Sequence, residues 1–398
     1  MMSLLLSSYT ASSCLGLGLD ATWQALQSQR SGLKPCDFET VALDTWIGEV
    51  PGVDAVQLPA ALQDWDCRNN RLALLGLQQD GFELAVQEAV RACGARRVGV
   101  FLGTSTSGML QTELAYRERH ASRGPLPDWF HYRETQNTYS VAAFVRSHIG
   151  IEGPAFVVST ACSSSAKVFA SAQRMMDMGL IDAAVVGGVD SLCLTTLYGF
   201  HSLQLLSPQP CAPYGAGRNG ISIGEAAAFA LLVRTPEQPP AGSVVLKGVG
   251  ESSDAHHMSA PHPQGLGAQL AMRSALDRAG LRADQIDYIN LHGTATPSND
   301  AAEDQAVCAV FGQHTPPCSS TKGHTGHTLG AAGGLEAVVC ALALRHQTVP
   351  GGCHTAALDP MLHANYQRSN APLAMQNVLS NSFGFGGSNS CLILGLAP

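Results

Sequence analysis

The sequence predicts an α/β protein built on parallel β-sheet. Short apolar runs that suit buried strands alternate with longer segments of helical periodicity, and glycines end several of these runs. One stretch shows the pattern completely. Residues 155–160 are strand-like, residues 162–178 are helical and stop before Gly179, and residues 183–186 form a further buried strand. Such a β-α-β unit implies a parallel sheet that helices cover on both faces.

The other elements repeat this alternation. The segment 234–242 is rich in Pro and Gly and is the best internal boundary, so we expect two parts, residues 1–235 and 236–398. The parts look architecturally alike. The remaining expected strands are 97–102, 288–291 and 391–394, and the remaining expected helices are 301–311 and 329–346.

Charge and composition exclude several classes of protein. The formal net charge of the 398 residues is −8, whereas a general nucleic-acid binder needs a basic face. Charged residues make up 14% of the chain, which is low for a soluble domain. The shortage of charge suggests that part of the surface is hidden in an oligomer.

Cysteine usage and hydropathy indicate the compartment. The chain has 12 cysteines without any CxxC pair, and several lie in apolar runs where cysteine acts as a small hydrophobe. Residues 1–19 lack the basic start of a signal peptide. No apolar stretch approaches the roughly 18 residues of a membrane span. We therefore expect a cytoplasmic protein without a transmembrane helix.

Three segments rich in glycine and hydroxyl groups carry the chemistry. They cover residues 159–165, 292–296 and 321–327, and the first two follow strand-like runs. In a parallel sheet, ligands bind at such strand ends. Cys162 lies where a strand passes into a helix, and the partial positive charge of a helix start favours a thiolate and an oxyanion. The alternative for Cys162 is a buried structural cysteine.

His292 and His327 stand in the other two segments. Together with Cys162 they could be zinc ligands, but they come from distant parts of the chain without chelating spacing. An acyl-transfer site requires this distribution, because its groups must converge on one carbonyl from several strands. The sequence therefore favours acyl transfer and no metal.

Four motifs, in order and at the expected separations, carry a family resemblance. The chain resembles the β-ketoacyl-acyl carrier protein synthases of types I and II, including polyketide ketosynthases, over nearly its full length. The motifs are Thr160-Ala161-Cys162-Ser163-Ser164, His292-Gly293-Thr294-Ala295-Thr296-Pro297, Lys322 with Thr325-Gly326-His327, and residues 381–389, NSFGFGGSN.

The resemblance implies a fold and a reaction. The fold is thiolase-like, with two similar βαβαβαββ halves that form a five-layered αβαβα core, normally in a dimer. In the reaction, an acyl group moves from the phosphopantetheine arm of a carrier protein to a cysteine. Malonyl-carrier protein then loses CO2, and its carbanion attacks the acyl-cysteine. The product is a 3-oxoacyl-carrier protein longer by two carbons.

The motifs assign roles by resemblance. Cys162 corresponds to the acylated nucleophile, and His292 and His327 to the pair that activates decarboxylation. Lys322 corresponds to the ordering lysine of the family, and Glu336 on the following helix to its buried carboxylate. A buried Lys and Glu are tolerable only as a hydrogen-bonded network.

The remaining roles concern the substrate. By resemblance, the N–H groups of Cys162 and Phe385 form the oxyanion hole, and the Phe385 ring gates the acyl pocket. Thr294 and Thr296 correspond to hydroxyls that bind the pantetheine arm. The carrier protein supplies this arm, so no permanently bound cofactor is expected.

Departures from the family pattern point to a specialised pathway. Residues 214–220, YGAGRNG, lack two acids of the family motif, and the loop 205–210 lacks arginines that often face the carrier protein. Arg68 and Arg71 remain as candidates for binding an acidic carrier. Thr106 is expected at the acyl pocket, and His324 near the site at most. We expect a specialised pathway of polyketide, aryl polyene or fatty-acid type.

Three alternatives remain in view. A non-catalytic chain-length factor, which shapes the pocket of a ketosynthase partner, would lack the nucleophile that is present here as Cys162. A thiolase would need a second cysteine where Phe385 stands, and the type III synthases have Asn in place of one His. The expected partners are an acyl carrier protein and a second subunit, identical or homologous.

Overall fold

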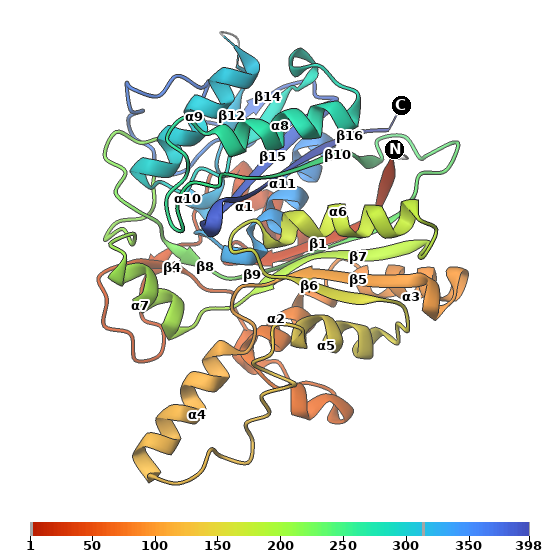
Figure 1. Ribbon diagram of the computed structural model, residues 1–398, viewed down its shortest axis with the longest axis vertical. Coiled ribbons are helices and arrows are strands. Elements are labelled where there is room, and N and C mark those ends of the chain that lie inside the picture. Colours follow the sequence, from red (N-terminus) through yellow and green to blue (C-terminus); the bar gives the residue numbers. More distant parts are fainter. Residues whose placement is uncertain (1–2, 313–314, 398) are drawn as a thin grey trace.

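The computed structural model describes residues 3–312 and 315–397 and confirms the α/β architecture (Figure 1). A large mixed sheet has the strand order β12-β11-β15-β16-β10-β1-β9-β7-β5-β6. Its strands are β1 (Leu4–Ser13), β5 (Val98–Gly103), β6 (Ala155–Val158), β7 (Ala183–Asp190), β9 (Ala226–Arg234), β10 (Val244–Ser253), β11 (Tyr288–Asn290), β12 (Cys318–Ser319), β15 (Asn377–Gly384) and β16 (Ser388–Leu396), with β2 (Gly16–Leu17) paired to β1.

The sheet consists of two five-stranded parts with the same internal order. From the centre outward one part runs β1-β9-β7-β5-β6 and the other β10-β16-β15-β11-β12. In each, the two inner pairings are antiparallel and the two outer pairings are parallel. The parts meet where Leu4 and Leu5 of β1 pair with Leu246 and Val245 of β10. This arrangement confirms the expected pair of similar βαβαβαββ halves.

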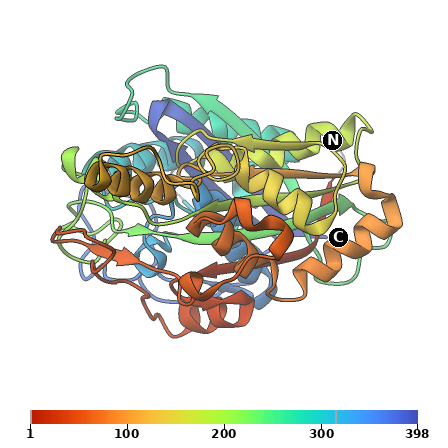
Figure 2. The same cartoon turned by 90° about the horizontal axis from the view of Figure 1, so that it is seen from below.

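Helices form the other layers (Figures 1 and 2). Helices α6 and α11 contact strands of both parts and lie between them, α2, α3 and α5 cover one outer face, and α8 and α9 cover the other. The helices are α1 (Gly18–Gln27), α2 (Arg68–Leu77), α3 (Phe82–Cys93), α4 (Met109–Ser122), α5 (Ser140–Ile149), α6 (Ser164–Asp177), α7 (Leu194–Ser202), α8 (Leu266–Ala279), α9 (Pro297–Phe311), α10 (Lys322–Thr325) and α11 (Ala332–His346). Short strands β3 (Lys34–Pro35), β4 (Trp46–Gly48) and β8 (Ile223–Gly224) form a small second sheet, and β13 (Thr348–Val349) pairs with β14 (Ala371–Pro372).

Helix α11 shows why a long apolar segment need not enter a membrane. Residues Leu329–His346 are long and apolar enough to cross a bilayer, contrary to the sequence expectation. However, 89% of this segment is buried inside the protein. Cys340, Ala341 and Leu344 of α11 pack in one core with Phe169 of α6 and with residues of both sheet parts. The segment is therefore the central core helix.

Strand β6 differs from its predicted environment. The sequence predicts a buried strand, but Phe156 is 51% exposed. The reason is position, because β6 pairs only with β5 and forms one edge of the sheet. Near this edge, α4 projects away from the layers (Figure 1).

Candidate active site

Cys162 lies in the turn between β6 and α6. Ala161 has a positive φ of 52°, which turns the chain sharply just before the cysteine. The Ser164 hydroxyl holds this turn by accepting a hydrogen bond from the Thr160 N–H at 2.9 Å and by donating to the Ala161 carbonyl at 2.5 Å. Close packing requires glycine at Gly103, where a Cβ would lie 2.3 Å from a backbone nitrogen of α6. The turn thereby fixes the position of the Cys162 side chain.

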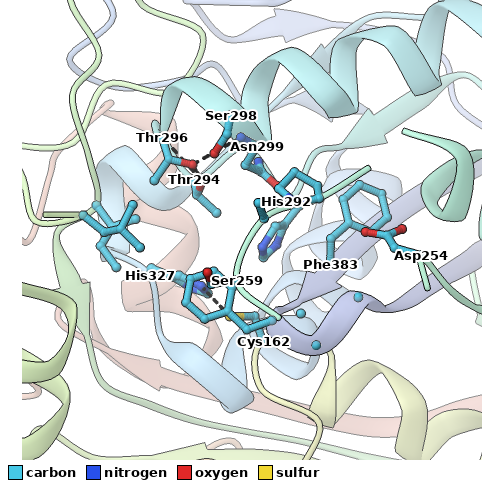
Figure 3. Close-up of a pocket in the computed structure, with 18 of the residues that line it drawn as sticks. Cys162, Asp254, Ser259, His292, Thr294, Thr296, Ser298, Asn299, His327 and Phe383 are labelled. Carbon is cyan, nitrogen blue, oxygen red and sulfur yellow. Dashed lines mark hydrogen bonds between the residues drawn. The ribbon is translucent and has the colours of Figure 1, made fainter. Parts of the chain in front are cut away.

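Two imidazoles converge on this sulfur from the other half of the fold (Figure 3). The Nε2 atom of His327 lies 2.9 Å from Cys162 Sγ. The His292 ring lies 5.3 Å from the His327 ring, nearly perpendicular to it. One ligand-type atom from each residue lies within 4.8 Å of the other two. Cys162, His292 and His327, which the sequence analysis selected from distant segments, therefore share one site.

Both imidazoles are uncharged in this environment. Burial lowers the pKa of His292 and His327 well below the usual value, and the positive charge of Lys322 lowers both further. A neutral imidazole has one N–H donor and one acceptor. The Lys322 ammonium lies 3.4 Å from His292 Nδ1, so that nitrogen accepts and Nε2 carries the proton. His292 is thereby prepared to donate a hydrogen bond from Nε2.

Lys322 is held in a buried network. Its ammonium donates to the His292 carbonyl at 2.5 Å and forms an ion pair with Glu336 Oε1. The side chains of Lys322 and Glu336 are only 2% and 3% exposed. Burial raises the pKa of Glu336 to about 7, and Lys322 opposes that shift. The predicted network of Lys322 and Glu336 is thus present next to the histidine pair.

The state of Cys162 differs from the sequence expectation. Burial raises the pKa of its thiol to about 12, whereas Lys322 and a hydrogen bond from the Phe385 backbone lower it. The resting sulfur is therefore a thiol and not the expected thiolate. Helix α6 begins two residues beyond the cysteine. His327 Nε2, 2.9 Å from the sulfur, is placed to donate a hydrogen bond to it.

A cavity opens above the three residues. Thr294, Thr296 and Phe385 line it together with Cys162, as the sequence predicts. The hydroxyls of Thr294 and Thr296 lie 2.9 Å apart (Figure 3). The backbone N–H of Phe385 points toward Cys162 Sγ, and its ring is 36% exposed. The sulfur thus lies in a cavity whose wall carries hydroxyl groups and one backbone donor.

Sequence reasoning missed two carboxylates that hold the site. Glu303 of α9 accepts hydrogen bonds from the N–H groups of His292 and Gly293, at 2.8 and 2.7 Å. Asp190, at the end of β7, accepts hydrogen bonds from the N–H groups of Ser105 and Gly330 and so ties together loops of both halves. The only available signals were an acid four residues after the predicted strand 183–186 and an acid early in the predicted helix 301–311.

The structure separates the two arginines that were candidates for binding a carrier protein. Arg68 is buried and pairs with Glu225 at 2.7 Å and with Asp54 at 2.8 Å. Arg71 is partly exposed and pairs with Asp66 at 2.5 Å. A buried arginine cannot meet a carrier protein, so the interpretation of Arg68 was wrong. Its partner Glu225 is 157 residues away in sequence, which hides the pair from sequence reasoning.

Two other expected neighbours of the site serve different purposes. The Thr106 hydroxyl donates to Asp190 at 2.7 Å, and Thr106 is absent from the described lining of the cavity. His324 is buried, and its ring nitrogens lie 3.1 and 3.0 Å from the carbonyls of Arg30 and Gly351. Both residues therefore fix backbone segments and do not face the cavity.

The cysteine and two histidines could geometrically hold a metal ion. The charge of the surroundings disfavours that use, because the Lys322 ammonium already contacts His292 Nδ1. The same lysine favours chemistry in which negative charge develops between the imidazoles. The arrangement suits acyl transfer, as the sequence predicts.

Comparisons with known proteins agree with this geometry. Residues 8–238 match the family model of the β-ketoacyl synthase N-terminal domain, and residues 243–356 match that of the C-terminal domain. Nodulation protein E of Rhizobium meliloti (strain 1021) is 32% identical over 394 residues, with 95% of each chain covered. The 3-oxoacyl-[acyl-carrier-protein] synthase 2 of Coxiella burnetii is 30% identical over 398 residues, covering 96% of this chain and 95% of that protein.

The fold has solved counterparts. The complex of the ketosynthase ApeO with its chain length factor ApeC from Xenorhabdus doucetiae contains a chain that is 40% identical. Its TM-score to this protein is 0.90, with 100% of this chain and 98% of that chain covered. The family models, the relatives and the fold agree, and the chain belongs to the β-ketoacyl synthase family of condensing enzymes.

Proposed function

We propose that the protein catalyses a decarboxylative Claisen condensation in which Cys162 carries the acyl group. The observation that supports this most directly is the convergence of Cys162, His292 and His327 within 4.8 Å at one cavity. The reaction joins an acyl thioester and a malonyl thioester and consumes one proton. It releases CO2 and a free pantetheine thiol and yields a 3-oxoacyl thioester longer by two carbons.

Acylation is the first step. The Cys162 sulfur attacks the carbonyl of the incoming thioester, the bond to the pantetheine sulfur breaks, and the thiol proton ends on that departing sulfur. The N–H groups of Cys162 and Phe385 stabilise the oxyanion of the tetrahedral intermediate. The hydrogen bond from the Phe385 backbone to the resting sulfur supports this assignment.

Decarboxylation is the second step. The malonyl thioester loses its carboxylate as CO2, and the electron pair of the broken C–C bond forms an enolate. Neutral His292 and His327 donate Nε2 hydrogen bonds to the enolate oxygen, and Lys322 sets the required His292 tautomer. The enolate carbon then attacks the acyl carbonyl on Cys162, and the cysteine sulfur leaves and is reprotonated.

The proposal also assigns roles to the phosphopantetheine arm and to the two halves of the fold. The phosphopantetheine arm of an acyl carrier protein lies along Thr294 and Thr296 and brings its thioester to Cys162. The arm belongs to the carrier, and the protein needs no cofactor of its own. Residues 1–235 supply the nucleophile and residues 236–398 supply the two imidazoles. The free cysteines fit a cytoplasmic location.

The second candidate function is that of a chain-length-factor-like subunit in a ketosynthase heterodimer. A chain of the ApeO–ApeC complex is 40% identical to this one, which makes a heterodimer with a homologous subunit a reasonable assembly, beside a homodimer. The presence of Cys162, His292 and His327 in one site favours the catalytic partner. The departures from the family motif at residues 214–220 favour a specialised pathway of polyketide, polyene or fatty-acid type.

The test is condensation of octanoyl- and malonyl-carrier protein, with products measured by mass spectrometry. Wild-type protein should form the 3-oxodecanoyl product, and Cys162→Ala should form none. His327→Ala should lower release of CO2 from malonyl-carrier protein far more than acylation of Cys162. Normal condensation by either variant would overturn the assignment of that residue.

A further inference from the structure

The carboxylate of Asp190, at the end of β7, is fully buried and accepts hydrogen bonds at both oxygens. Its Oδ1 accepts from the Thr104 hydroxyl and the Ser105 N–H, both at 2.7 Å, and from the N–H and hydroxyl of Thr106, at 2.8 and 2.7 Å. Its Oδ2 accepts from the Gly330 N–H of the other half and shares the Ser105 N–H at 3.0 Å. Burial raises the pKa of Asp190, and these hydrogen bonds lower it. Because a backbone N–H can only donate, this environment requires the ionised carboxylate.

The turns that supply these donors are strained. Leu329, directly before Gly330, has a positive φ of 52° although its side chain is bulky. Ser107, directly after Thr106, has a positive φ of 47°. A residue with a side chain keeps such a conformation only where its surroundings enforce it. The hydrogen bonds to Asp190 hold both turns.

The Leu329 turn follows His327 closely in the chain. The peptide groups of His327 itself pair with β8, because its N–H donates to the Ser222 carbonyl at 2.7 Å and its carbonyl accepts from the Gly224 N–H at 3.0 Å. The chain beyond this pairing is held by Asp190, three residues after the histidine. The backbone of His327 is thus fixed from two sides.

The two imidazoles of the site are oriented in different ways. The Lys322 ammonium lies 3.4 Å from Nδ1 of His292, as described above. Nδ1 of His327 is buried and has no hydrogen-bond partner among the described residues. A hydrogen bond at one ring nitrogen ordinarily sets the direction of the other. The direction of the His327 Nε2 therefore depends on the backbone that carries the ring.

We propose that Asp190 is a positioning residue for decarboxylation, because its hold on the Gly330 N–H fixes the turn after His327 and thereby aims the His327 Nε2. The inference rests on the proposed function, in which that nitrogen donates a hydrogen bond to the enolate oxygen. Such a donor aids the reaction only when it points to the place where charge develops. Asp190 is absent from the described lining of the cavity, so its effect passes through His327.

The experiment measures two rates in the variant Asp190→Asn, CO2 release from malonyl-carrier protein and acylation of Cys162 by octanoyl-carrier protein. The amide oxygen can keep the bonds from Thr104 and Thr106, because most donors converge on Oδ1. The amide NH2 then faces the Gly330 N–H, one donor against another. The kcat for CO2 release should fall by about tenfold to a hundredfold, whereas its KM and the acylation rate should change less than about threefold.

The variant Gly330→Ala disturbs the same contact from the other side. Its Cβ would lie 2.7 Å from Asp190 Oδ2 and 2.6 Å from Ser105 Oγ, so the turn must shift. CO2 release should again fall more than acylation. Agreement between the two variants would place the effect at this contact.

The matched control is Asp80→Asn. Asp80 also accepts a threonine hydroxyl and a backbone N–H, from Thr10 at 2.7 Å and from Leu19 at 3.0 Å, but it holds the start of α1 and lies outside the site. Its positive φ of 54° suits asparagine. This variant should leave both rates unchanged.

The ratio of the two rates decides the proposal. Equal slowing of both, or unchanged CO2 release in a variant whose circular dichroism shows the native fold, would overturn it. If Asp190→Asn does not fold, the same ratio in Gly330→Ala decides. Wild-type protein that is acylated at Cys162 but releases no CO2 from malonyl-carrier protein would instead refute the proposed function.

Discussion

Substitution of Lys322 tests how much its buried ion pair with Glu336 contributes to the stability of the protein. The variant Lys322→Met keeps the length and packing of the side chain and removes the ammonium. Glu336 then loses its ion pair, and because its Oε2 already has no partner, the carboxylate is left without one at either oxygen. Both side chains are almost fully buried, so solvent does not screen the loss. Breaking such a pair costs about 3–5 kcal/mol of stability.

The double variant Lys322→Met/Glu336→Leu isolates the pair. Replacing both charges by apolar groups should bring the free energy of unfolding back to within about 1 kcal/mol of wild type or above it. Unfolding in urea at fixed protein concentration, followed by tryptophan fluorescence, measures this cycle. The double variant should still fail to decarboxylate malonyl-carrier protein, because nothing then sets the His292 tautomer. The double variant should therefore regain stability without regaining activity.

The pH dependence of the single variant has a definite sign. In wild type the pKa of Glu336 is raised to about 7, and removal of the lysine raises it further. A carboxyl group whose pKa is raised by folding destabilises the folded protein as the pH rises from its pKa in the unfolded chain to its pKa in the folded protein. The loss of Lys322→Met relative to wild type should therefore grow from pH 6 to pH 9. A loss below about 1 kcal/mol at every pH, or a double variant no more stable than the single one, would refute this reasoning.

Three further predictions follow from the same contacts. Glu303→Gln places an amide against the N–H groups of His292 and Gly293, so the free energy of unfolding in urea should fall by about 1–3 kcal/mol. Release of CO2 should slow more than acylation, and equal slowing of both steps would count against the role of Glu303 in positioning His292. Because the thiol pKa is raised to about 12, alkylation of Cys162 by iodoacetamide should rise about tenfold per pH unit from 7 to 9, whereas a plateau near pH 7 would contradict the thiol assignment. Gly103→Ala puts a Cβ 2.3 Å from the Ser165 nitrogen and should cost about 1–3 kcal/mol and slow acylation. The control Gly217→Ala, with open space around its Cβ, should leave acylation unchanged.

Much of the fold could be predicted from local patterns. The strand, helix and strand around Cys162 appear as β6, α6 and β7, because apolar runs and the glycines that end them are local signals. The expected strand 391–394 is part of the longer β16. The burial of β6 could not be predicted, since edge position depends on which strands pair with it.

The same distinction holds for the site. Cys162, His292, His327 and Lys322 stand in short motifs whose residue types reveal the chemistry. Glu303 was missed and Arg68 was misinterpreted because their roles depend on contacts that only the folded chain creates. A buried arginine and a solvated one look alike in a helix when the partner carboxylate is far away in sequence.

The account rests on one covalent bond, between the acyl group and the sulfur of Cys162. Peptide mapping by mass spectrometry after incubation with octanoyl-carrier protein measures it directly, because the 12 cysteines of the chain fall at distinct positions. The account predicts the octanoyl mass on the peptide with Cys162 alone, and no labelled peptide in Cys162→Ala. Octanoyl on another cysteine in wild-type protein, or on the Cys162→Ala variant, would contradict it.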